Sequence, residues 1–245
     1  MKTQNLQYQR KLEAKILFES ISPYLARDSK ILEIGSGDGH QVEYLSAFGS
    51  VFLLDLVIPK QVKGYFTVGN GEQLPFKKNA FDIIFTSHVV EHLYNKEKFF
   101  SETRRVAKTD AYYIHVVPTQ VWKFLADLDY YPLTIFNGIK KFLGHQSLST
   151  KYTNESGNHG SSKPSFFRIL KSKLLPPVHG TSKNLIEEYR NFEPQAWRKC
   201  FLKNGFKIVE EYPLLTYSPP ELMLVPPNRF LAKLGFPSSV AFLLK

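Results

Sequence analysis

The segment at residues 31–40 constrains the fold more than any other part of the chain. It reads Ile-Leu-Glu-Ile-Gly-Ser-Gly-Asp-Gly-His, an apolar run that contains Glu33 and leads into glycines at positions 35, 37 and 39. Such a run predicts a buried parallel strand, and alternating glycines allow a backbone turn too tight for side chains. A ligand can therefore approach the main chain at the carboxyl end of this strand, where open α/β sheets bind nucleotide-like molecules.

The spacing of these glycines discriminates between ligands. A dinucleotide fingerprint has its third glycine at the sixth position, where this chain has His40. The remaining pattern, acid-x-Gly-x-Gly-x-Gly, resembles that of class I S-adenosylmethionine-dependent methyltransferases. The resemblance implies that Gly35 and Gly37 lie against the methionine and ribose parts of S-adenosylmethionine, and that Glu33 helps to hold the methionine amino group.

Three further segments match the same family in the same order. The run at 51–55 ends in Asp55, 20 residues after Gly35, and an acid there can accept hydrogen bonds from both ribose hydroxyls. Residues 65–76 resemble the third strand and the adenine-binding turn of the family, although Asn70 replaces the usual Asp. Its side-chain carbonyl can still accept a hydrogen bond from the adenine amine.

The remaining cofactor residues follow from the same resemblance. The backbone amide of Gly71 is expected to reach an adenine ring nitrogen. Residues 81–85 give the fourth strand, and Ser87 after it is expected to line the cofactor cleft mainly through its backbone. S-adenosyl-L-methionine is thus the expected cofactor.

The alternation of strands and helices predicts an α/β fold with a parallel sheet. Apolar runs predict strands near 31–34, 51–55, 81–85, 112–117, 206–212 and 240–244, and helices near 6–26, 40–48, 96–107 and 194–204. The resemblance places one more strand at the start of 65–76. The resemblance adds a Rossmann-like three-layer sandwich with seven strands, the last one antiparallel. We predict a single domain over 1–245, with a cofactor-binding half at 1–118, a helical and loop insertion for the acceptor at 119–185, and closing helices and strands at 186–245.

The insertion differs from the rest of the chain in charge. Residues 119–245 hold 17 Lys or Arg against 9 Asp or Glu, and residues 137–183 hold 8 against 1. A basic surface with interleaved aromatics suits an anionic acceptor or an acidic membrane face, but a solubilising surface explains the charge equally well. The aromatic and basic residues at 122–123, 130–131 and 140–141 are expected to lie at a lipid headgroup boundary. Nothing resembles a nucleic-acid-binding module, so we expect no nucleic-acid partner.

Three histidines are candidates for the catalytic base. A hydroxyl acceptor must lose a proton, and histidine suits that task at neutral pH. His88 and His92 follow the fourth strand, and His179 lies at the end of the insertion. His88, Glu91 and His92 would share one helix face, but metal-binding members of the resembled family use carboxylates where this chain has His88. We therefore expect no metal.

The acceptor is expected to be a hydroxyl of a sugar, a lipid-linked glycan or another small metabolite. Pro-Pro-Val-His-Gly at 176–180 and the helices after it are similar to bacterial methyltransferases associated with glycan biosynthesis. RNA methylation is one alternative, and a non-catalytic cofactor-binding scaffold in a glycan-assembly complex is another. The single cysteine and the lack of a secretory signal predict a cytoplasmic protein, with peripheral contact at the inner face of the membrane.

Overall fold

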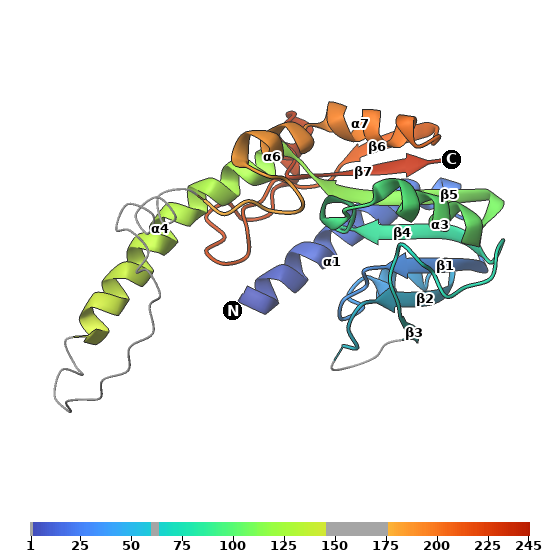
Figure 1. Ribbon diagram of the computed structural model, residues 1–245, viewed down its shortest axis with the longest axis horizontal. Helices are drawn as coiled ribbons and strands as arrows, with labels where there is room; N and C mark the ends of the chain where they lie inside the picture. The colour runs from blue at the N-terminus through green and yellow to red at the C-terminus, as the bar shows by residue number, and fades with distance from the viewer. Residues whose placement is uncertain (1, 60–63, 146–175) are drawn as a thin grey trace, which may run out of the picture.

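The computed structural model describes residues 2–59, 64–145 and 176–245, which fold around one seven-stranded sheet (Figure 1). The strand order is β3-β2-β1-β4-β5-β7-β6. β1 to β5 run parallel, and β7 is antiparallel to both β5 and β6. The strands are β1 (Ser29–Ile34), β2 (Gly49–Asp55), β3 (Tyr65–Val68), β4 (Phe81–Ser87), β5 (Ala107–Pro118), β6 (Ile208–Pro213) and β7 (Ser239–Leu244).

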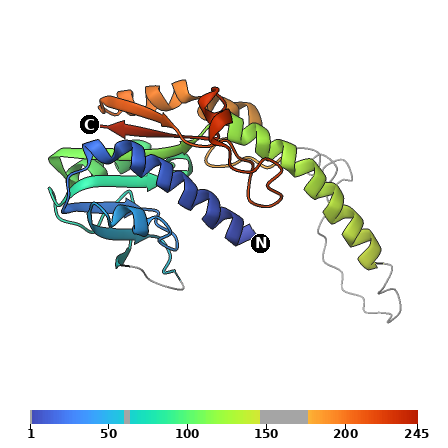
Figure 2. The same ribbon diagram turned by 180° about the vertical axis from the view of Figure 1, so that it is seen from behind.

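Helices cover both faces of the sheet. They are α1 (Lys2–Ile21), η1 (Ser22–Tyr24), α2 (Val42–Leu45), η2 (Val90–His92), α3 (Lys96–Val106), α4 (Gln120–His145), α6 (Leu185–Asn191), α7 (Pro194–Lys203) and α8 (Arg229–Lys233). Buried side chains of α3 and α7 form one core with the sheet, and those of α1 and α2 form a second core on its other face. The two opposite views show α3 in front of the sheet in Figure 1 and α1 in front of it in Figure 2.

The connection order places a ligand site at one edge of this sheet. The chain leaves β1 toward β2 and β3 on one side, then returns to β4 and β5 on the other side. The carboxyl ends of β1 and β4 therefore face a crevice between diverging connections, which is where open α/β sheets bind ligands. α4 leaves β5 and projects away from the body of the molecule (Figures 1 and 2).

The predicted fold class is confirmed, including the antiparallel last strand. Two elements are longer or shorter than the sequence predicts: β5 begins at Ala107 rather than at 112, and the helix expected over 40–48 is the single turn α2. Residues 120–145 form one helix that continues through Pro132. The expected short turn near 60 and the loop expected at 146–165 lie outside the described residues.

Gly49 shows how closely β1 and β2 approach each other. Its φ is +151°, and a Cβ at this position would lie 1.9 Å from the carbonyl oxygen of Ser29. We expect Gly49→Ala to lower the free energy of unfolding by about 3 kcal/mol or more, since the clash is with backbone. Gly235 has a φ of +98° and no atom within 4 Å of a Cβ. Gly235→Ala should therefore cost only about 1–2 kcal/mol, from φ alone. Urea unfolding of both variants measures the difference, and equal losses would contradict it.

Candidate active site

The glycine turn after β1 is held against the end of β2. Gly35 and Gly37 have φ values of +74° and +51°, which side chains disfavour. The amide of Gly35 donates to the carbonyl of Leu54 at 2.7 Å, and the amide of Gly37 donates to the carboxylate of Asp55 at 2.8 Å. A Cβ on Gly35 would lie 2.3 Å from Val89. The loop thus needs glycine both for its conformation and for its contacts.

Glu33 is a buried carboxylate with an unsatisfied oxygen. Its side chain is 2% exposed, and its Oε2 has no hydrogen-bond partner. Burial, together with the nearby Asp55 charge, raises the pKa of Glu33 to about 8. Glu33 lines a cavity of about 260 Å³ with Gly35, Gly37 and Ser87. A cationic amino group in this cavity would supply the missing partner, so the residues fit the methionine end of S-adenosylmethionine.

The other cofactor residues named from the sequence lie outside that cavity. Asp55 does not line the cavity, but its carboxylate accepts a hydrogen bond from the amide of Gly37, which does. Asn70 is exposed in the turn after β3, and its Oδ1 accepts a hydrogen bond from the amide of Glu72 at 2.9 Å. A Cβ on Gly71 would lie 3.0 Å from the ring of Phe99, so the turn packs closely on α3. The adenine-binding roles of Asn70 and Gly71 stay predictions.

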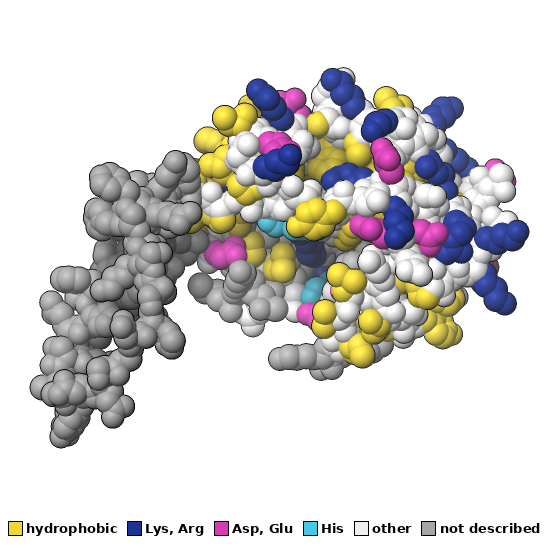
Figure 3. Space-filling model, viewed as in Figure 1, with side chains coloured by type: hydrophobic (Ala, Val, Ile, Leu, Met, Phe, Trp, Pro, Cys, Tyr) yellow, Lys and Arg dark blue, Asp and Glu magenta, His cyan; other side chains and the backbone are white. Residues whose placement is uncertain are grey.

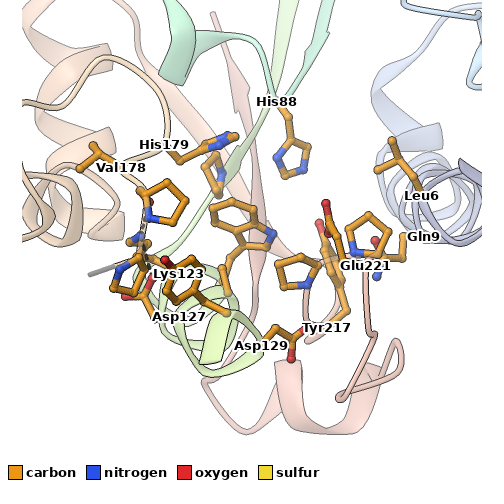
Figure 4. A pocket seen from close by; sticks show the side chains of 18 of the residues that line it. Leu6, Gln9, His88, Lys123, Asp127, Asp129, Val178, His179, Tyr217 and Glu221 are labelled. Carbon is orange, nitrogen blue, oxygen red and sulfur yellow. Dashed lines mark hydrogen bonds and ion pairs between the residues drawn. The ribbon is translucent and has the colours of Figure 1, made fainter. Parts of the chain in front are cut away.

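A second, larger cavity of about 590 Å³ lies next to the first one (Figure 4). Both cavities are lined by Leu6 and Arg10 of α1. The larger one is mostly apolar, with walls from α1, α4 and the segments that follow the insertion and β6. In the space-filling view, histidine side chains lie in a hollow bordered by hydrophobic side chains, whereas Lys and Arg gather toward α3 and α7 (Figure 3). The lining includes Gln9, His88, His92, Pro118, Trp122, Lys123, Asp127, Asp129, Tyr130, Val178, His179, Tyr217 and Glu221.

His88, which lines the larger cavity, lies between two buried carboxylates. Its Nε2 is 3.7 Å from Oε2 of Glu13, and its Nδ1 is 3.5 Å from Oε1 of Glu91. Its φ of +55° is unusual for a residue other than glycine, and its amide donates to the carbonyl of Val116. The strained backbone directly after Ser87 therefore turns this imidazole toward the cavity, as Figure 4 shows.

Glu13 is held by a network that the sequence did not reveal. Arg10 donates to it at 2.9 Å, the hydroxyl of Tyr217 donates at 2.8 Å, and Ser239 also donates to it. Although burial opposes this, Arg10 and His88 lower the pKa of Glu13 to about 2. The sequence signal for this network is a polar Gln9, Arg10 and Glu13 cluster on an otherwise apolar helix face.

All three predicted histidines line the one large cavity. The rings of His92 and His179 lie 4.7 Å apart in an edge-to-face arrangement, and His179 also packs 4.8 Å from Trp122. Burial, with His92 nearby, lowers the pKa of His179 to about 4. The structure thus brings His179 to the same cavity as two histidines that lie 87 and 91 positions before it in the sequence.

The expected position of Lys123 at a lipid boundary is wrong. Lys123 is 1% exposed, and its Nζ lies 2.7 Å from Asp127 and 3.2 Å from Glu188. It also donates to the carbonyl of Pro177 at 3.1 Å. A buried ammonium requires such partners, so this lysine connects α4 to α6 and to the segment before His179. Within the described ranges, no helix is both long and apolar enough to traverse a bilayer.

Known proteins resemble the part of the chain that contains the glycine turn. Residues 32–115, which begin within β1, include the glycine turn and extend into β5, match the family model of a methyltransferase domain. Residues 32–115 therefore form a methyltransferase domain of the class I, S-adenosylmethionine-dependent type. S-adenosylmethionine is therefore its cofactor, and the predicted enzyme activity is confirmed.

Two sequence relatives and one solved structure illustrate the similarity. An uncharacterized protein of Methanocaldococcus jannaschii is 28% identical over 195 residues, which cover 72% of this chain and 82% of that protein. Ajmaline N-methyltransferase of Rauvolfia serpentina is 44% identical, but over only 46 residues, 19% of this chain and 16% of that enzyme. A structure of a methyltransferase from Aquifex aeolicus superposes with a TM-score of 0.53 at 15% identity, covering 100% of this chain and 97% of that one.

We expect cofactor binding to this methyltransferase to release a proton through Glu33. With a pKa near 8, Glu33 is largely protonated in the free protein at pH 7, and the cofactor ammonium would favour its ionised form. Calorimetry in buffers of different ionisation enthalpy should show close to one proton released at pH 7, and the affinity should rise as pH approaches 8.

The Glu33→Gln variant should lose both effects. We expect its cofactor affinity to fall by about tenfold or more, because a charge-assisted contact is removed. Asp82→Asn is the matched control, since Asp82 pairs with Lys108 at the start of β4, at the opposite end of the strand from the site. Equal affinities for Glu33→Gln and Asp82→Asn would refute the role of Glu33.

Proposed function

We propose that this methyltransferase transfers a methyl group to a hydroxyl of a small, uncharged acceptor, such as a sugar, bound in the larger cavity. The observation that carries this proposal is the position of His88, which lines the larger cavity and directly follows Ser87, a residue that lines the cofactor cavity. A hydroxyl must be deprotonated as it attacks, and an imidazole there is placed to accept that proton.

The charges around the cavity support an uncharged acceptor. Its two cationic side chains are already paired, Arg10 with Glu13 and Lys123 with Asp127 and Glu188. Most of the basic residues that suggested an anionic acceptor lie between 146 and 175, outside the described residues. The aromatic and proline lining suits the apolar faces of a small molecule.

The mechanism asks little of the protein beyond alignment and proton transfer. S-adenosylmethionine supplies a methyl group on a positively charged sulfur. The acceptor must be held in line with that methyl group, which the adjoining cavities allow. His88 takes the hydroxyl proton, and the charge that it gains lies between Glu13 and Glu91. Burial opposes ionisation of Glu91, but its contact with His88 lowers the pKa of this carboxyl, so both neighbours carry negative charge at neutral pH.

The proposal is tested with a panel of acceptors and labelled cofactor. We expect S-adenosylhomocysteine to form with a neutral sugar or similar hydroxyl compound, and mass spectrometry should locate the methyl group on oxygen. A panel that includes amines and RNA separates the alternatives, because the short match to the Rauvolfia N-methyltransferase makes an amine a reasonable comparison. Turnover with RNA or amines alone would overturn the proposal.

We expect His88→Gln to lower kcat by about 100-fold to 10,000-fold, because that is the usual contribution of a general base. Its cofactor affinity should change less than twofold, since His88 does not line the cofactor cavity. His145→Gln, at the far end of α4, is the control substitution and should leave kcat unchanged. If His88→Gln keeps more than half of the activity, another group removes the proton.

A further inference from the structure

Glu91, His92 and His179 form a compact group of metal-binding side chains. One ligand atom from each residue lies within 4.8 Å of the other two. Glu91 is 2% exposed, and neither of its carboxylate oxygens accepts a hydrogen bond. The nearest ionisable nitrogen is Nδ1 of His88, at 3.5 Å. A buried carboxylate with such incomplete pairing is costly unless something else contacts it.

The backbone around His179 is fixed against η2. Gly180 has a φ of +71°, and a Cβ on it would lie 2.6 Å from the carbonyl oxygen of Glu91. The amide of Thr181 donates to that same carbonyl at 3.2 Å, and the amide of His179 donates to Glu188 at 3.0 Å. The position of the His179 ring therefore depends on a close backbone approach that only glycine permits.

The donors suit a transition metal. One carboxylate and two imidazoles are typical ligands of Zn²⁺ and related ions, which bind nitrogen at about 2.1 Å. Tetrahedral bonds of that length require donors about 3.4 Å apart, so the group must contract by roughly an ångström. The His92 side chain is 48% exposed and can rotate.

We propose that Glu91, His92 and His179 bind one divalent transition-metal ion at the wall of the larger cavity. His92 and His179 both line that cavity. Three protein ligands leave a further position for a ligand from the cavity. An ion there would bind an acceptor hydroxyl and lower its pKa, which assists proton transfer to His88. This role of the ion in the reaction rests on the proposed function, whereas the ion site itself is independent of it.

The expectation of no metal was based on His88, Glu91 and His92, because metal-binding members of the resembled family have a carboxylate where this chain has His88. The proposed site contains His179 instead of His88, and the turn at Gly180 brings His179 to the group. A ligand 87 positions after His92 could not be assigned from local spacing.

The test is metal binding by the full chain, without cofactor or acceptor. After treatment with a chelator, the protein is titrated with Zn²⁺ by calorimetry and with Co²⁺ by visible absorption. We expect one ion per chain and the strong absorption bands of Co²⁺ in a four-coordinate site. His92→Ala and His179→Ala should each weaken Zn²⁺ binding by at least about 100-fold. Loss of a residue that only supports a metal ligand weakens binding by up to about 100-fold, and loss of a direct ligand should cost at least as much.

Two controls make the outcome decisive. Gly180→Ala should weaken binding by displacing His179, whereas Gly235→Ala should not, although both glycines have positive φ. Cofactor affinity, measured in parallel, should be unchanged in His179→Ala, which shows that the variant is folded. Binding without a defined stoichiometry, or equal binding by His179→Ala and the unsubstituted protein, would overturn the proposal. Metal binding by a protein that transfers no methyl group to any hydroxyl acceptor would instead support the metal site and contradict the proposed function.

Discussion

The structure depends on the burial of carboxylates at the carboxyl end of a parallel sheet. A buried carboxylate must be neutralised or hydrogen-bonded, or it remains protonated. Glu13 is paired with Arg10, Glu188 with Lys123, and Glu91 only with nearby histidines. Oε2 of Glu33 and both carboxylate oxygens of Glu91 have no hydrogen-bond partner among the described residues. The unpaired carboxylates thus mark where ligands are needed, and the paired ones hold the walls in place.

Much of the cofactor side could be predicted from the sequence because its signals are local. A strand, a glycine turn and an acid at the end of the next strand lie within about 25 residues, and the parallel register brings Glu33 and Asp55 to the same edge. The geometry of the turn then follows from backbone sterics. The same reasoning placed Ser87 in the cleft, where the structure also has it.

The acceptor side could not be predicted to the same extent, because it depends on contacts between distant segments. Lys123 has the sequence context of an exposed, amphipathic helix, and only the arrival of Glu188 and Pro177 shows that it is buried. Tyr217 reaches Glu13 across 204 positions. Such pairings depend on how segments distant in the sequence pack together, and local periodicity contains no information about that.

The shared wall formed by α1 has an energetic consequence. Leu6 and Arg10 border both cavities, so a ligand in either cavity restricts the same helix. Ordering that helix has an entropic cost. The first ligand to bind bears this cost, and the second ligand then binds without it. Donor and acceptor should therefore favour each other's association by equal factors, as reciprocity between two coupled equilibria requires.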